Sequence, residues 1–185
     1  MQTSDFCAKA KKYEEDILSG KIPACVYVKQ AIRRQRDDLK RWSGKASPFY
    51  FDKAEGNRVC KFIELLPHTK GALRGQKIKL EPWQCWILTT IFGWRRRSDN
   101  RRRFGRVYIE VPRGNGKSSL SSGVALYCLL ADREPGAEVY SFATTRDQAG
   151  IVFGDAKQMA MMCEPLRKKF GLEVLAKALF VPGTN

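Results

Sequence analysis

The feature that most constrains the fold is a glycine-containing loop between a strand-like run and a helix-like run. Residues 106–111 are rich in β-branched and aromatic side chains, which predicts a buried strand. Residues 118–130 predict a helix, and the segment Pro112-Arg113-Gly114-Asn115-Gly116-Lys117 connects the two. A turn of this kind directs backbone N–H groups at an anion in front of the helix N-terminus. The sequence therefore predicts a phosphate-binding loop in an α/β fold.

Each residue type in this loop suits a nucleoside triphosphate. Gly114 and Gly116 allow close backbone approach and positive φ angles. Lys117 is placed to reach the β- and γ-phosphates, and the Ser118 hydroxyl suits Mg²⁺. The full G-x-x-x-x-G-K-[ST] pattern has glycine at position 111, where this chain has Val111. The flanking strand, helix and second strand compensate for that departure, so ATP with Mg²⁺ is the predicted ligand.

Arg113 has two interpretations. Its guanidinium can fold over the γ-phosphate and stabilise the charge that develops there in the transition state. Alternatively, it forms an ordinary salt bridge on the surface.

The segments after the loop predict the topology. Residues 137–143 form a second strand-like run, and a helix is expected from residues 144–147 to about Met162. Strand, helix, strand and helix in this order form a βαβ unit, so the two strands should be parallel. The predicted fold class is α/β of the P-loop NTPase type (ASCE-like), with a partial parallel sheet whose exposed edges favour self-association.

Helices dominate the part before the loop. Apolar periodicity and caps predict helices at residues 6–18, capped by Ser4 or Asp5, and at 23–42, 52–66 and 82–94. We therefore expect a helical N-terminal lead-in over residues 1–75 and a partial P-loop ATPase core over 76–185.

Composition narrows the possible partners. The formal net charge of +15 favours a polyanion such as nucleic acid over a merely solvated basic surface. There is no apolar run long enough to span a membrane, and the N-terminus is too charged for a signal peptide. The six cysteines lack metal-ligand spacing, so they are expected to be reduced packing residues.

Several stretches resemble phage terminase large subunits, particularly the group typified by phage HK97. The resemblance includes an altered Walker A loop at residues 111–118, segments 80–84 and 92–94 upstream, and segments 130–140 and 143–149 downstream. Residues 62–71 extend it over most of the chain. It implies an ATPase motor that drives double-stranded DNA into a procapsid, in the cytoplasm of a bacterial host and encoded by a phage or prophage. It further implies a portal protein, a terminase small subunit and other copies in a ring as partners.

The resemblance also implies site residues. Arg113 and Lys117 are the predicted catalytic residues, and Ser118 is the predicted Mg²⁺ ligand. Gln84 is the expected reader of adenine, because its amide can both donate and accept, whereas neighbouring Trp83 can equally be core. The full predicted nucleotide-binding set is Gln84, Arg113, Gly114, Asn115, Gly116, Lys117, Ser118 and Ser119.

Two further segments, one basic and one polar, each have two possible interpretations. The arginine-rich segment 95–103 is either a DNA-contacting loop or a solvated surface. Thr144, Thr145 and Arg146 either contribute to DNA contact and coupling or cap the following helix.

Packaging motors also need an acidic motif after a third strand, which organises Mg²⁺ and activates water. Four carboxylates farther downstream follow no convincing apolar strand; they are Asp147, Asp155, Glu164 and Glu173. No nuclease domain is apparent. We therefore expect the N-terminal ATPase segment of a terminase, or a prophage remnant, that binds ATP but hydrolyses it poorly alone. The alternatives are a non-catalytic nucleic-acid-binding protein and a small-molecule kinase.

Overall fold

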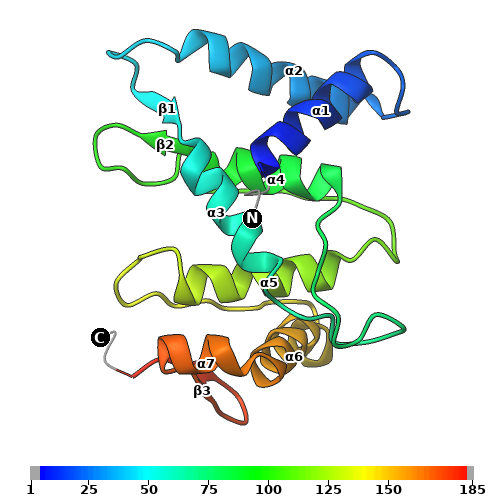
Figure 1. The fold of residues 1–185 in the computed structure, drawn as a ribbon, viewed down its shortest axis with the longest axis vertical. Helices are drawn as coiled ribbons and strands as arrows, with labels where there is room; N and C mark the ends of the chain where they lie inside the picture. The colour runs from blue at the N-terminus through cyan, green and yellow to red at the C-terminus, as the bar shows by residue number, and fades with distance from the viewer. Residues whose placement is uncertain (1–4, 183–185) are drawn as a thin grey trace. The chain divides into compact units, whose positions relative to one another are not determined.

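The structure, a computed structural model, describes residues 5–182 (Figure 1). The chain divides into two compact units, each described here by itself. Unit 1 comprises Met1–Lys61 and Leu80–Ile109, and unit 2 comprises Phe62–Lys79 and Glu110–Asn185. The phosphate-loop sequence therefore lies in unit 2, whereas Gln84 and the arginine-rich segment lie in unit 1.

The four predicted N-terminal helices are confirmed. They are α1 (Phe6–Leu18), α2 (Val26–Arg41), α3 (Lys53–Ile63), which ends in unit 2, and α4 (Pro82–Gly93). The α1 N-cap is Asp5, whose side chain accepts a hydrogen bond from the Ala8 backbone, and the other expected cap, Ser4, lies outside the described residues. Helix α1 packs along α4, as Figure 1 shows. Their apolar faces form much of the unit 1 core, which includes Phe6, Ile17, Ile32, Leu80, Leu88 and Phe92.

A pair of short strands, distant in sequence, completes unit 1 and was not predicted. Strand β1 (Phe49–Phe51) pairs antiparallel with β2 (Trp94–Arg96), so the arginine-rich segment begins as a strand rather than a loop. Trp94 is fully buried, and its Nε1 donates to Gln35 Oε1 at 2.7 Å. Its ring packs edge-on against Phe51. The side-chain oxygen of Gln35 therefore provides the hydrogen-bond acceptor that the buried indole N–H needs.

A buried carboxylate ties three helices of unit 1 together. Glu14 on α1 accepts a hydrogen bond from Trp86 Nε1 on α4 at 3.0 Å and pairs with Arg36 on α2 at 3.3 Å. Burial raises the pKa of Glu14, and the hydrogen bonds from Trp86 and Arg36 offset only part of this rise. The side chain thus holds α1, α2 and α4 together at the edge of the core.

Unit 2 is built on three helices. They are α5 (Lys117–Leu130), α6 (Arg146–Met162) and α7 (Glu164–Phe170), of which α7 was not predicted. Two short antiparallel strands follow, β3 (Glu173–Val174) and β4 (Leu179–Phe180). Helix α5 packs against α6, and the two lie side by side in Figure 1.

The structure does not show the predicted parallel sheet. Residues 106–111 and 137–143 belong to no strand or ladder within the described residues, where all strand pairs are antiparallel. Their apolar side chains are exposed: Tyr108 and Phe142 are each 86% accessible. Strand formation needs a neighbouring segment that accepts and donates backbone hydrogen bonds in a ladder, and neither segment takes part in such a ladder among residues 5–182. The observed fold class is therefore mixed helix and strand with small antiparallel sheets.

Three further observations on the described residues concern membrane spans, cysteines and metal ligands. No helix there is both long and apolar enough to cross a membrane. None of the six cysteines, all of which lie in the described residues, forms a disulfide, and Cys60 and Cys85 are buried. No group of three or more potential metal-ligating side chains is found in residues 5–182.

Candidate nucleotide-binding site

The predicted phosphate loop runs directly into the first residue of α5. Pro112 to Lys117 are exposed, whereas Ser118 and Ser119 are half-buried in the first helical turn. The first backbone bond of α5 runs from Leu120 N to Gly116 O at 2.9 Å. The loop therefore presents its backbone to solvent while its C-terminal end is fixed in a helix.

Two glycines give the loop its shape. Gly114 has φ +84° and Gly116 has φ +70°, both in the left-handed region that side chains disfavour. A Cβ at Gly114 would meet no atom within 4 Å, so its requirement for glycine is conformational rather than steric. These angles turn the chain so that the loop meets the start of α5.

The start of α5 lacks a side-chain cap. Its N-cap is Gly116, which has no side chain to accept from the first-turn N–H groups. Those donors, together with the helix dipole, leave a partial positive charge at this end. The first turn also carries no acidic residue. An anion can take the place that a capping side chain occupies at other helices of this chain, such as Asp5 at α1.

The loop is closed by its own polar side chains. The Lys117 ammonium donates to the backbone oxygens of Val111 and Pro112. Asn115 Nδ2 lies within hydrogen-bond distance of Pro112 O and Arg113 O, at 3.3 and 3.4 Å. Lys117 thus points back over the loop, on the side where the predicted phosphates would lie, and Asn115 braces the turn. This bracing role of Asn115 was not anticipated.

Arg113 is exposed at the loop apex. No carboxylate among the described residues forms an ion pair with it, so the surface salt-bridge interpretation has no support. Its guanidinium therefore keeps its charge and its donors for a ligand.

Helix α5 is anchored behind the loop by close packing within unit 2. The Ser122 hydroxyl lies 2.8 Å from both Ser118 O on α5 and Val152 O on α6. A Cβ at Gly123 of α5 would lie 3.2 Å from Cγ1 of Ile63, the last residue of α3, so α5 approaches the end of α3 closely there. One turn later, the ring of Tyr127 packs edge-on against Phe62. These contacts hold the loop-bearing end of α5 in place.

Gln84 lies in unit 1, at the start of α4. Its Oε1 accepts from the Glu81 backbone N–H at 2.9 Å, as one half of a capping box that also includes the Glu81 side chain. The side-chain NH₂ group remains as a donor. Trp83 beside it is half-buried. Gln84 therefore has a structural role in capping α4, and its predicted role in adenine recognition stays a prediction.

The polar residues after the second predicted strand cap a helix. Thr145 is the N-cap of α6, and its side chain accepts from Gln148 N at 3.3 Å. The Thr144 hydroxyl lies 2.8 Å from Gln148 Oε1. The capping interpretation is confirmed, and it leaves Arg146 as the first residue of α6.

The downstream carboxylates are placed in helices and a short strand. Asp147 lies in the first turn of α6, Glu164 begins α7, and Glu173 is in the two-residue β3. Asp155 is buried and committed, since it accepts from Thr69 at 3.2 Å and pairs with Lys70 at 2.8 Å. None of the four has the position after a buried strand that the predicted acidic motif requires.

Comparison with protein families gives one match. The model for the terminase large subunit, ATPase domain, matches residues 82–174, which is half of the chain. The matched span begins at α4, includes the loop and α5, and ends at β3. No curated protein and no solved structure matches the chain.

Proposed function

This chain belongs to the family of terminase large subunit ATPase domains, and we propose that it binds ATP with Mg²⁺ at residues 111–119. The proposal is supported above all by the uncapped start of α5 behind two glycines with positive φ. Such a start is a ready site for a polyphosphate, because unpaired N–H groups and the helix dipole act together. ATPase activity is the function that the family match itself supports.

The loop residues divide the work of binding. The first-turn amides of α5 and the Lys117 ammonium would hold the phosphates, with Lys117 exchanging its bonds to Val111 O and Pro112 O for phosphate oxygens. Arg113, which pairs with no carboxylate in the described part of the chain, would add charge at the γ-phosphate. Ser118 would hold Mg²⁺, which supplies charge neutralisation between phosphate oxygens. Gln84 would read the adenine.

We further propose that this activity belongs to a DNA-packaging motor of the HK97 type. Duplex DNA, a portal protein, a terminase small subunit and other copies in a ring would be its partners, in the cytoplasm of a phage-infected bacterium. The exposed segments 106–111 and 137–143 would pair as parallel strands of a P-loop sheet once partner strands are available. Their strand-forming residues and exposed rings support this, since a ladder would pair their backbones.

Weak hydrolysis by the purified chain is expected. None of the four downstream carboxylates stands where it could activate water, and Asp155 is already paired with Lys70. Phosphate release with Mg²⁺ and ATP should therefore equal that of Lys117→Ala, with or without duplex DNA. Steady release that Lys117→Ala abolishes would show that a carboxylate of this chain serves as the base.

The second candidate is a non-catalytic nucleic-acid-binding protein. It is favoured by the basic charge of unit 1, which contains 21 of the 34 Lys and Arg residues but only 10 of the 19 Asp and Glu residues. Under this alternative, duplex DNA binding would be steep in salt and the chain would not bind ATP.

A further inference from the structure

A basic surface outside the family match lies on α2 in unit 1. A hollow of about 570 Å³ is lined by six side chains of this helix: Gln30, Arg33, Arg34, Asp37, Asp38 and Arg41. Arg33, Arg34 and Arg41 are exposed, and none forms an ion pair with a carboxylate among the described residues. The first and last of them are eight positions apart, which is about 12 Å along a helix.

The acidic residues of the hollow do not cancel this charge. Asp38 is buried and committed: its Oδ1 accepts from Trp42 Nε1 at 3.2 Å, and its Oδ2 pairs with Arg103 at 2.9 Å. Asp37 alone remains as an exposed carboxylate. The hollow therefore carries a net positive charge and favours an anionic partner.

Aromatic rings support these arginines without neutralising them. The Arg34 guanidinium lies over Phe104 at 5.6 Å, and Arg41 lies over Trp42 at the same distance. The ring of Trp42 in turn packs edge-on against Phe49. Cation–π contact restrains a guanidinium while leaving its N–H donors free for another group. The surface is thus partly organised before a ligand arrives.

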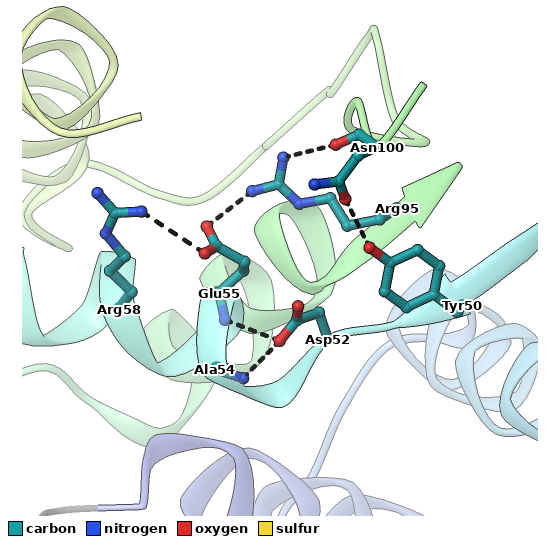
Figure 2. A network of polar contacts seen from close by, with 7 residues as sticks. All are labelled: Tyr50, Asp52, Ala54, Glu55, Arg58, Arg95 and Asn100. Atoms are coloured by element: carbon teal, nitrogen blue, oxygen red, sulfur yellow. Dashed lines mark hydrogen bonds and ion pairs between the residues drawn. The ribbon is translucent and has the colours of Figure 1, made fainter. Parts of the chain in front are cut away.

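The arginine-rich segment after α4 is organised differently in part: Arg97 lies over the Tyr50 ring at 5.0 Å, as the α2 arginines lie over their rings, but other arginines of the segment are paired with carboxylates. Figure 2 shows Arg95 held inside a network, with bonds to Glu55 at 2.9 Å and to Asn100 O at 3.3 Å. In the same network Glu55 also pairs with Arg58, and Tyr50 bonds to the Asn100 side chain. Arg96 pairs with Asp99, and Arg103 with Asp38. Arg95, Arg96 and Arg103 of this segment are therefore paired with carboxylates of the fold.

We propose that Arg33, Arg34 and Arg41 on α2 form a contact surface for the phosphodiester backbone of duplex DNA. The inference deepens the proposed packaging function, because it names where its DNA partner would touch this chain. Guanidinium groups bind phosphate oxygens in pairs, and three along 12 Å suit a repeating polyanion. The rings beneath them are half-buried and covered, so bases have no exposed ring to stack on, and backbone contact without sequence preference follows.

The test compares two triple variants of equal charge change in the same unit. Fluorescence anisotropy with a labelled 30-base-pair duplex would be measured for the full chain across salt concentrations. Arg33→Ala/Arg34→Ala/Arg41→Ala should weaken binding at least about tenfold and reduce the log–log salt slope by about 2 to 3, one for each lost phosphate contact. Arg96→Ala/Arg97→Ala/Arg101→Ala should weaken it severalfold less. The Arg→Lys triple on α2 should keep most of the affinity, and a single strand of equal length should bind more weakly.

Each other outcome overturns the inference. An equal or larger loss in the 96/97/101 variant would place the contact on that segment instead. Unchanged binding in the α2 variant, or no DNA binding by the wild-type chain, would also contradict it and would leave an acidic protein as the partner. ATP binding by the same α2 variant, expected to be unchanged, decides the proposed nucleotide site separately. If the chain binds ATP but not DNA, only the proposed DNA contact surface is contradicted, and the proposed nucleotide site stands.

Discussion

Lys117→Ala is expected to weaken Mg-ATP binding by about 10- to 150-fold. A hydrogen bond to a charged group contributes about 1.5–3 kcal/mol, and 1.4 kcal/mol corresponds to a tenfold change in affinity. Among residues 5–182, the Lys117 ammonium donates to the loop oxygens of Val111 and Pro112 and pairs with no carboxylate. Its removal therefore takes away the main cation of the loop without leaving a buried carboxylate unpaired.

The matched control is Lys177→Ala, which removes the same charge from an exposed position in unit 2. Its affinity for Mg-ATP should stay within about twofold of the wild type, because exposed charges far from a ligand are screened by salt. Equilibrium titration of a fluorescent ATP analogue measures both variants. Equal affinities for Lys117→Ala and wild type would move the nucleotide away from this loop.

Gly93→Ala is expected to destabilise unit 1 by about 1–3 kcal/mol, the usual cost of overfilling a packed core. A Cβ at this position would lie 2.6 Å from Phe51 Cε2 and 3.2 Å from the backbone oxygen of Asp52. The Phe51 ring cannot swing away freely, because it packs against buried Trp94. The Gly93 oxygen also accepts from Asp52 N at 2.7 Å, which fixes the two backbones together. The glycine of the Phe92-Gly93-Trp94 stretch is therefore required by packing.

Tryptophan fluorescence isolates this effect from unit 2. All four tryptophans of the chain lie in unit 1, so their urea transition reports on that unit. Gly105→Ala is the control, since a Cβ there meets no atom within 4 Å, and its midpoint should barely move. If Gly93→Ala unfolds at the same urea concentration as Gly105→Ala, the close approach of α4 to β1 is not as described.

The helices could be predicted because their determinants are local. Caps such as Asp5 and the spacing of apolar residues along α1 to α4 are properties of short windows, and the structure reproduces them within a few residues. Helix α7 was missed because only seven residues, containing Pro165, separate Cys163 from Gly171. So short a segment has little periodicity to detect.

The strands could not be predicted in the same way, because pairing depends on distant residues. Residues 106–111 have strand composition but belong to no ladder within the part of the chain that the structure describes. Phe49–Phe51 forms a strand because Trp94–Arg96, more than 40 residues away, pairs with it. Composition describes what a segment can form, and pairing decides whether it does.

The candidate site likewise contains features that follow from local sequence and features that depend on the fold. The positive φ of Gly114 and Gly116 follows from residue type and turn context, and so could be expected. The bonds from Lys117 to the loop oxygens and the capping bond of Gln84 depend on side-chain geometry that no sequence pattern specifies. The same holds for the arginine-rich segment, where Glu55 and Asp38 lie far from the arginines in sequence and become their partners only in the fold.

Isothermal titration of the full wild-type chain with ATP tests the central claim most directly. With Mg²⁺ present, we expect saturable binding of one nucleotide per chain. Binding should be much weaker when Mg²⁺ is chelated, because the ion, held at Ser118, would neutralise charge on the phosphates. A folded sample, verified by its circular dichroism and its cooperative urea transition, that gives no heat of binding at millimolar ATP would contradict it. The loop before α5 would then be a turn and not a nucleotide site.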